Sequence, residues 1–428
     1  MSIIDFDEAP NMKSMKQQLN SKTDRSSWQP RYAERMNGVQ ASEIRELLKV
    51  IDQPDMISFA GGIPEPTLFP TDNIRAIYND ILSSNEEACK ALQYSVSEGD
   101  SELRSWIANH MQRRGVPCSL DHILITNGSQ QALEFLGKLF ISPGSRVAVT
   151  APTYLGALQA FAPSQPKYTT LRISEENGIA LEKRLDSMES NHAFAYIVPD
   201  FANPTGESLS EKDRLAILAL ADEHDMPIIE DSPYEMLRFD GSPELPIQAL
   251  DIKDIGDIDA SRVIYCGSFS KVFTPGLRVG WVCASRKIID QLTLIKQGSD
   301  LNSPAINQKV ILHLARQTYD VQVKRACSVY KEKRDTMLSL LASVLPAGSQ
   351  WTRPSGGMFI WVTLPSEIDT KKLLATAAKN FGVAFVPGSA FFADGSGKNT
   401  LRLSYTLPSV DEIKIGLHRL GQAIASLQ

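Results

Sequence analysis

The sequence predicts an α/β fold in which a large domain, built on a mostly parallel sheet flanked by helices, precedes a smaller α+β domain. Three observations lead to this prediction. From about residue 71, short apolar runs alternate with amphipathic stretches of helical spacing, which is typical of parallel strands joined by crossover helices. After about residue 300 helical patterns dominate, and strand-like runs return only near residue 358. The chain has 428 residues, which suits one large and one small domain better than a single core.

Each expected element follows from its local pattern. A polar stretch predicts a tail or arm over 1–30, and apolar spacing after Ser42 predicts a short amphipathic helix over 42–51. Apolar runs predict the strands of the large domain, at 123–126, 146–150, 194–198, 228–229, 263–266 and 279–282. The second region is expected to hold helices over 305–345 and 409–426 and strands at 358–362, 383–386 and 401–405. These patterns divide the chain into a tail (1–30), an N-terminal helix segment packing with the small domain (31–57), a large domain (58–302) and a small domain (303–428).

Composition excludes several classes of function. Hydrophobic residues make up 43% and charged residues 22% of the chain, which is ordinary for a globular protein. The net charge of −6 gives no reason to expect nucleic acid or an anionic membrane as partner, and no apolar run is long enough to cross a bilayer. The five cysteines are scattered and odd in number, which predicts reduced thiols and a cytoplasmic location. The six histidines form no close pair, so no metal site is expected.

Polar side chains follow the predicted strands of the large domain, at the edge where ligands of such sheets bind. Ser129 and Gln130 begin a helix after the strand at 123–126, and a helix N-terminus attracts anions. Tyr154 follows the next strand, where its ring can lie flat against an aromatic ligand. Two further strand ends carry polar residues, namely Asn203, Asp231 and Tyr234. Taken singly, each of these is equally well explained as a cap or a turn residue.

The stretch from Gly267 to Arg278 supplies the most reactive group. Ser268, Ser270 and Arg278 donate hydrogen bonds of the kind that phosphate oxygens accept. Lys271, between them, is a candidate for a Schiff base with an aldehyde cofactor. A surface turn rich in serine and lysine is the alternative for this stretch alone. The chemistry of pyridoxal phosphate (PLP) needs all the roles found at these strand ends together, which favours the functional interpretation.

Several motifs identify a resemblance that extends from about residue 40 to the C-terminus. They are Gln93-Tyr94-Ser95, Gly128-Ser129-Gln130-Gln131, Asn203-Pro204-Thr205-Gly206, Asp231-Ser232-Pro233-Tyr234, Gly267-Ser268-Phe269-Ser270-Lys271 with Arg278, and Leu401-Arg402-Leu403-Ser404. On these motifs the sequence resembles the fold type I PLP-dependent aminotransferases. This resemblance implies an aspartate aminotransferase-like fold with a seven-stranded sheet. Three stretches, 41–45, 58–64 and 353–359, are similar in particular to the α-aminoadipate and kynurenine aminotransferase subgroup.

The resemblance implies a role for each cofactor residue. Lys271 would form the Schiff base and carry a proton, and Asp231 would pair with the protonated pyridine nitrogen. Tyr154 would stack on the ring, and Asn203 and Tyr234 would hydrogen-bond the ring oxygen. The phosphate would be held by Ser129, Gln130, Ser268, Ser270 and Arg278. Lys271, Asp231 and Tyr234 are therefore the expected catalytic residues.

The resemblance also implies how substrate and a second subunit would be engaged. Arg402 would grip the substrate α-carboxylate, with Asn203 and the backbone of Gly62 beside it. Arg45 would face a distal carboxylate of the substrate. Tyr94 would reach the phosphate and substrate in the neighbouring subunit, so that a homodimer with shared active sites is expected.

The expected reaction is a ping-pong transamination that moves the amino group of an L-amino acid to a 2-oxo acid such as 2-oxoglutarate. The expected donors are 2-aminoadipate, aromatic, leucine-like and glutamate side chains, with broad specificity. Another PLP reaction on the same fold, by a β-lyase or decarboxylase, is an alternative that the fold leaves open. A third possibility is the PLP-binding domain of a transcription regulator. It is disfavoured because residues 1–40 are too short and too weakly basic for a winged-helix segment.

Overall fold

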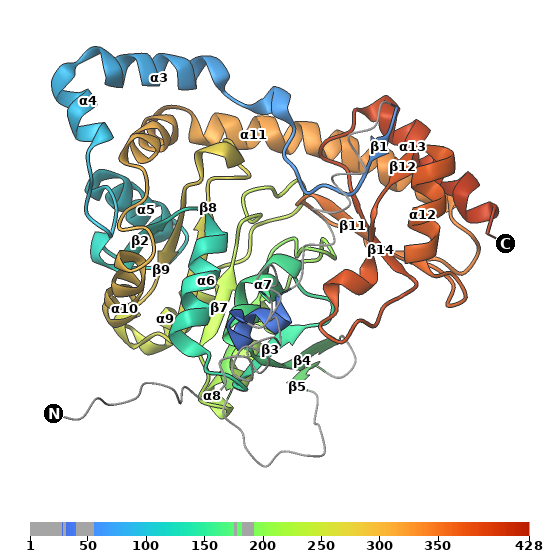
Figure 1. Cartoon of the computed structure of the whole chain (residues 1–428), viewed down its shortest axis with the longest axis horizontal. Helices are drawn as coiled ribbons and strands as arrows, with labels where there is room; N and C mark the ends of the chain where they lie inside the picture. Colours follow the sequence, from blue (N-terminus) through green and yellow to red (C-terminus); the bar gives the residue numbers. More distant parts are fainter. Residues whose placement is uncertain (1–27, 29–30, 40–54, 175–177, 182–191, 428) are drawn as a thin grey trace, which may run out of the picture.

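The computed structural model describes residues 28, 31–39, 55–174, 178–181 and 192–427. The predicted helix at 42–51, with Arg45 on it, and nearly all of the predicted tail lie outside the described residues. The chain forms a large sheet flanked by helices and, beside it, a smaller sheet with helices of its own (Figure 1). No helix within the described residues has the length and apolar character that a bilayer span requires.

The large sheet has eight strands among the described residues, in the order β2-β9-β8-β7-β6-β3-β4-β5. In that order they are Ile123–Thr126, Gly280–Cys283, Val263–Ser268, Ile228–Asp231, His192–Ile197, Arg146–Thr150, Lys167–Ser174 and Gly178–Leu181. Neighbours from β8 to β4 pair parallel, whereas β9 is antiparallel to both of its neighbours and β5 is antiparallel to β4. The prediction of a mostly parallel sheet is confirmed, with β5 as an eighth strand beyond the seven that the resemblance implied.

The sequence pattern predicts no strand at β4 or β5. β4 begins with the polar stretch Lys167-Tyr168-Thr169-Thr170, whereas β5 is the short apolar stretch Gly178-Ile179-Ala180-Leu181. β4 pairs with β3 and β5 pairs with β4 at one edge of the sheet, so both strands are placed by pairing.

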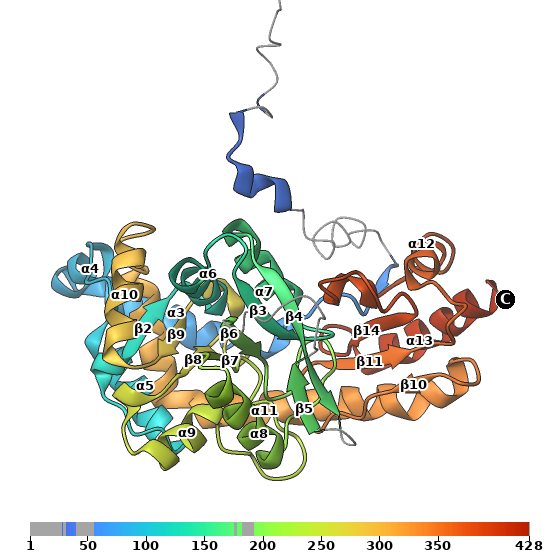
Figure 2. The ribbon, with the colours of Figure 1, turned by 90° about the horizontal axis from the view of Figure 1, so that it is seen from below.

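Helices cover both faces of the large sheet (Figure 2). On one face lie α6 (Ser129–Phe140), α7 (Leu155–Phe161) and α10 (Arg286–Gln297), whose apolar side chains share a core with Val147 and Val149 of β3. On the other face lie α5 (Ser101–Arg113), α8 (Glu211–Glu223) and α9 (Ile247–Ile255). Since both faces are closed by apolar packing, polar side chains of the sheet can meet a ligand only at the strand ends.

The second sheet has the order β10-β11-β14-β13 and is antiparallel throughout. These strands are Gln350–Trp351, Phe359–Thr363, Thr400–Ser404 and Val386–Pro387. Beside them β1 (Ile57–Ser58) pairs parallel with β12 (Val383–Ala384), so the stretch predicted as one strand at 383–386 forms two short strands in different sheets. Two helices, α12 (Thr370–Phe381) and α13 (Val410–Ala425), cover this region.

One long helix, α11 (Ala305–Val344, 40 residues), joins the two regions (Figure 1). Its first half packs in the core of the large sheet through Val310 and Leu314, and its second half packs in the core of the small sheet through Tyr330 and Leu341. Among the described residues, the remaining helices are α3 (Thr71–Ser83), α4 (Asn85–Leu92) and short 3-10 turns at Glu34–Gly38, Pro66–Leu68, Leu120–His122, Ala162–Ser164, Ile258–Ala260, Pro275–Leu277 and Gly388–Phe391. The domain boundary at 302/303 stays a prediction.

Candidate active site

A pocket of about 130 Å³ lies at the carboxyl ends of the central strands. β7 ends there at Asp231, β8 ends at Ser268, and α6 begins there at Ser129. The lining includes every cofactor residue predicted for this subunit's own site, namely Ser129, Gln130, Tyr154, Asn203, Asp231, Tyr234, Ser268, Ser270, Lys271 and Arg278. Sequence reasoning missed three apolar members of the lining, Val198, Pro233 and Pro275. The fold thus brings together residues that are scattered along the chain from Ser129 to Arg278.

Lys271 presents its amine inside this pocket. The Nζ atom donates a hydrogen bond to the carbonyl oxygen of Gly62 at 3.1 Å and lies 5.9 Å from the centre of the Tyr234 ring. Desolvation of the amine, together with the nearby charges of Arg402 and Arg278, lowers the pKa of Lys271 to about 8. The neutral, nucleophilic form of the amine is therefore populated just above neutral pH, which an unperturbed lysine does not achieve.

Asp231 is a buried carboxylate whose two oxygens differ. Oδ2 accepts a hydrogen bond from the hydroxyl of Tyr196 at 2.7 Å, whereas Oδ1 is buried and has no partner. Burial raises the pKa of Asp231 to about 6, and the hydrogen bond from Tyr196 acts in the opposite direction. The carboxylate is thus ionised at neutral pH, with one oxygen free to accept from a protonated ligand atom.

Arg402 is almost fully buried, and its guanidinium has several neutral partners. Nη1 donates to Oδ1 of Asn203 at 2.7 Å, and Nη2 donates to the carbonyl oxygen of Ala60 at 2.5 Å. The guanidinium carbon lies 4.3 Å from the ring centre of Phe359 and 5.0 Å from that of Phe391, where aromatic faces stabilise a cation. Burial lowers the pKa of Arg402 to about 10, so the group stays charged at neutral pH.

The charge on Arg402 is not paired with an acid. Nε is buried without a hydrogen-bond partner, and among the described residues no carboxylate forms an ion pair with this guanidinium. A buried cation without a counter-ion is costly unless an anion binds to it. Arg402 is therefore suited to hold a carboxylate that a ligand supplies. Arg402 itself is not among the residues that line the pocket. Asn203, which does line it, connects the two, since its Nδ2 donates to the hydroxyl of Tyr234 at 3.4 Å.

Hydrogen-bond donors gather at the other end of the pocket. The hydroxyl of Ser268 lies 3.0 Å from that of Ser270, and Arg278 donates through Nη2 to the carbonyl oxygen of Asn127 at 3.2 Å. Arg278 approaches so closely that a Cβ atom at Gly128 would lie 2.4 Å from its Nη2. Glycine is needed there for this reason and because its φ of +79° is strained for other residues.

These donors surround the first turn of α6, which begins at Ser129. A helix N-terminus with hydroxyl and guanidinium donors is suited to bind a phosphate group. At the opposite side the unpartnered Oδ1 of Asp231 is suited to accept from a protonated ring nitrogen, and the amine of Lys271 is suited to react with an aldehyde. The residues present therefore fit pyridoxal phosphate, on the basis of their own chemistry.

The remaining predicted substrate residues do not all lie at the pocket. Gly62 contributes the carbonyl that Lys271 contacts, and a Cβ atom there would lie 2.7 Å from the Phe359 ring. Tyr94 does not line the pocket. It follows α4 and is 79% exposed, so its role in a neighbouring subunit stays a prediction. Arg45 lies outside the described residues.

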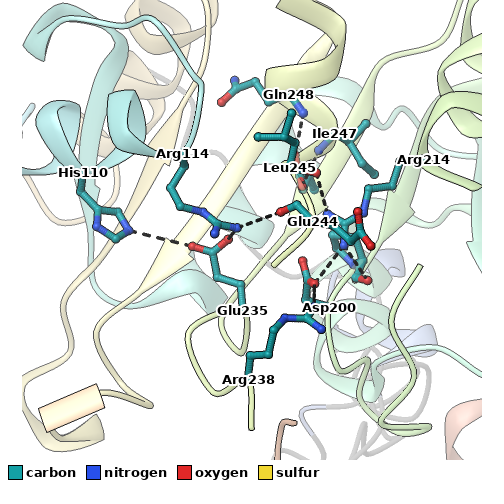
Figure 3. Close-up of polar contacts among 12 residues, drawn as sticks. His110, Arg114, Asp200, Arg214, Glu235, Arg238, Glu244, Leu245, Ile247 and Gln248 are labelled. Carbon is teal, nitrogen blue, oxygen red and sulfur yellow. Dashed lines mark hydrogen bonds and ion pairs between the residues drawn. The ribbon is translucent and has the colours of Figure 1, made fainter. Parts of the chain in front are cut away.

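Sequence reasoning missed a largely buried polar network around Glu235 and Asp200 (Figure 3). Glu235, next to Tyr234 in the chain, is held by Arg114 at 3.0 Å, and Asp200 is held by both Arg214 at 2.9 Å and Arg238 at 3.0 Å. Burial acts to raise the pKa of Glu235, but the charge of Arg114 and the contacts with His110 and Tyr265 together hold that pKa below its ordinary value. These ion pairs fix the two loops that carry Tyr234 and Asn203, and no local sequence signal marks them.

Two other findings bear on the chemistry of this chain. Among the described residues, no three histidine, cysteine or carboxylate side chains are grouped so that they could hold a metal ion. All five cysteines are free thiols, and three of them (Cys118, Cys266 and Cys283) are buried. The groups that bear on the chemistry are thus the amine of Lys271, the carboxylate of Asp231 and the guanidinium of Arg402.

Comparison with known proteins places this arrangement among known families. The family model described as "Aminotransferase class I and II" matches residues 65–420. The chain is 40% identical to aromatic-amino-acid aminotransferase 1 of Thermococcus litoralis, over 96% of this chain and 98% of that protein. The crystal structure of LysN, an α-aminoadipate aminotransferase from Thermus thermophilus complexed with N-(5'-phosphopyridoxyl)-L-leucine, superposes with a TM-score of 0.83 at 38% identity, covering 94% of this chain and 99% of that one. A multiple substrate aminotransferase from Thermococcus profundus also gives 0.83 at 38% identity, covering 94% and 98%.

Proposed function

Since this chain belongs to the class I and II aminotransferases and is a PLP-dependent transaminase, we propose that it accepts a broad set of amino donors. These are 2-aminoadipate, aromatic and leucine-like amino acids and glutamate, with a 2-oxo acid such as 2-oxoglutarate as acceptor. The observation that carries the proposal is the proximity of a reactive amine, Lys271, to the buried guanidinium of Arg402, which has no acidic partner among the described residues. An α-amino acid carries the carboxylate that Arg402 would bind and the Cα hydrogen that Lys271 would remove.

The contacts above support a role for each pocket residue toward the cofactor. Bound pyridoxal phosphate would supply an electron-withdrawing ring that weakens the Cα–H bond of the amino acid. Oδ1 of Asp231 would accept from the ring nitrogen, and the ring of Tyr154 would stack on the cofactor. Asn203 and Tyr234 would hydrogen-bond the ring oxygen. The phosphate would be held by Ser129, Gln130, Ser268, Ser270 and Arg278.

Two residues act on the substrate itself. Arg402 binds the α-carboxylate through its guanidinium, and the neighbouring Asn203 and the backbone of Gly62 limit how the carboxylate can turn. This orientation presents the Cα hydrogen to the amine of Lys271. The amine would take the proton from Cα and later return it, and a general base works best when its pKa lies near the operating pH. The lowered pKa of Lys271, about 8, supports this role.

Breadth of specificity is supported by the relatives rather than by a single side chain. A relative named for α-aminoadipate was crystallised with a leucine adduct, and another is named for multiple substrates. We further propose a homodimer in which Tyr94 of each subunit reaches the other's site, for which its 79% exposure is a prerequisite. A cytoplasmic location is proposed from the five free thiols.

Arg45 is proposed to bind the distal carboxylate of acidic substrates. Arg45→Ala is expected to lower kcat/KM for 2-aminoadipate by about tenfold or more, since a charge-assisted hydrogen bond contributes about 1.5–3 kcal/mol. The value for leucine should change by less than about twofold, because leucine has no distal carboxylate. Steady-state kinetics with both donors test this, and an equal loss on the two donors would remove the role of Arg45.

The function is tested by offering purified protein a panel of amino donors with 2-oxoglutarate. Each accepted donor is expected to convert the aldehyde form of the cofactor to its amino form, seen as a change of its absorption, with release of the matching 2-oxo acid. Adding 2-oxoglutarate should then restore the first spectrum. Release of carbon dioxide or of a β-substituent in place of the 2-oxo acid would instead support a decarboxylase or β-lyase.

A further inference from the structure

Tyr196 contacts the proposed cofactor carboxylate and belongs to none of the motifs of the sequence. It lies on β6, the strand next to β7, which ends at Asp231. Its side chain is fully buried, and its ring packs edge-on against Phe161 at 5.8 Å between ring centres. In the sequence it stands within the apolar run Ala195-Tyr196-Ile197, so it looks like an ordinary core aromatic residue.

The hydroxyl of Tyr196 donates a 2.7 Å hydrogen bond to Oδ2 of Asp231. This bond is short and charge-assisted, and both groups are shielded from water. It makes the two oxygens of the carboxylate unequal, because Oδ2 is satisfied and Oδ1 is not. A carboxylate held at one oxygen cannot turn its other oxygen away from the pocket without breaking that bond.

The other titratable side chains around Asp231 do not offer a competing anchor. Cys266 lies opposite Asp231 on β8, and burial keeps the pKa of this thiol well above its ordinary value, so it stays neutral. Tyr234 lines the same pocket, and burial likewise raises its pKa. Among the described residues no cation forms an ion pair with Asp231. Tyr196 is thus the hydrogen-bond donor that distinguishes one oxygen from the other.

We propose that Tyr196 is a positioning residue for the cofactor ring: its hydroxyl occupies Oδ2 of Asp231 and directs Oδ1 at the pyridine nitrogen. This inference rests on the proposed function, because it takes Asp231 as the partner of that nitrogen. Its consequence is specific. Tyr196 matters for binding a ring that carries a nitrogen and not for binding a ring of the same shape that lacks one.

The test compares two ligands on the full chain after removal of the cofactor. One is pyridoxal phosphate, and the other is the analogue in which the ring nitrogen is replaced by a CH group. Tyr196→Phe is expected to weaken the binding of pyridoxal phosphate by about tenfold or more, equivalent to about 1.4 kcal/mol, and that of the analogue by less than about twofold. When Asp231→Asn is already present, adding Tyr196→Phe should not further lower the affinity for pyridoxal phosphate relative to that for the analogue.

A matched control is Tyr168→Phe on β4, the strand next to the edge strand β5. Its hydroxyl donates to the carbonyl oxygen of Leu158 at 3.3 Å, outside the pocket, so both affinities should match those of the unaltered chain. If Tyr196→Phe weakened the binding of both ligands equally, Tyr196 would only support the fold. If it weakened the binding of neither ligand, the proposal would also be overturned. If the unaltered chain binds both ligands equally, Asp231 is not the partner of the ring nitrogen. The panel of amino donors would still test separately whether the protein catalyses transamination.

A second measurement covers the case in which Tyr196→Phe does not fold. 3-Fluorotyrosine placed at position 196 keeps both the ring and the hydroxyl, and its fluorine resonance responds to the hydrogen bond with Asp231. The resonance is expected to move when pyridoxal phosphate binds and to move clearly less when the nitrogen-free analogue binds. Identical shifts with the two ligands would overturn the proposal.

Discussion

Lys271→Ala is expected to abolish ordinary turnover while leaving the chain able to bind pyridoxal phosphate weakly. The change removes the amine that reacts with the aldehyde and the base that moves the Cα proton. Loss of a positioned base alone lowers a rate on the order of a thousandfold. The donors around the first turn of α6 and the carboxylate of Asp231 remain, so non-covalent binding should persist. Steady-state rates and equilibrium titration with the cofactor measure the two effects separately.

The control for this change is Lys253→Ala, which removes an exposed lysine from α9, outside the pocket. It should leave both turnover and cofactor affinity unchanged. Lys271→Arg offers a further comparison, because it keeps a positive charge in the pocket but cannot act as a neutral amine. Substantial turnover in either variant of Lys271 would contradict its role as the reactive amine.

Arg402→Ala is expected to lower kcat/KM by at least about thirtyfold for every amino donor. Removing one partner of a desolvated charged pair costs on the order of 2–5 kcal/mol, and about 1.4 kcal/mol corresponds to a factor of ten. The loss should be similar for acidic, aromatic and aliphatic donors, since all of them carry the same α-carboxylate. This pattern contrasts with the selective loss expected for Arg45→Ala. Measuring kcat/KM for one acidic, one aromatic and one aliphatic donor tests whether the loss is the same for all three.

Arg316→Ala is the matched control, because it removes an arginine whose ion pair with Glu102 is exposed on the surface. Such pairs contribute little, so its kinetics should be unchanged. Arg402→Ala also leaves Oδ1 of Asn203 without its donor, which would loosen the pocket. The affinity for the cofactor should therefore be measured alongside. A near-normal kcat/KM would remove Arg402 from the substrate site.

Much of the site could be predicted because its residues stand at strand ends that the sequence marks clearly. Asp231 ends the strand at 228–231, and Lys271 follows the strand at 263–268, so parallel strands were expected to bring them to one edge. Local motifs likewise indicated the hydrogen-bond donors proposed to hold the phosphate. Each of these signals spans only a few neighbouring residues, so it can be recognised in the sequence alone.

Other parts could not be predicted because their partners are distant in the chain. Tyr196 looks like a core residue until its hydroxyl meets Asp231, 35 positions away. Arg114 and Glu235 form a buried ion pair across 121 positions, and neither residue stands in a recognisable pattern. The strands β4 and β5 were also missed, since β4 is placed by pairing with β3, and β5 by pairing with β4.

The sequence by itself determined the chemical groups of this protein and the order in which strands and helices present them. Hydrophobic periodicity and turn residues depend on a few neighbouring positions, so they can be recognised without knowing the fold. Only the tertiary structure decided which groups meet. Arg402 reaches Asn203 across 199 positions and Ala60 across 342, where the small sheet lies against the large one. That contact depends on how two cores pack around α11. The same packing leaves the guanidinium buried without an acid among the described residues, which is the basis for proposing that it binds a substrate carboxylate.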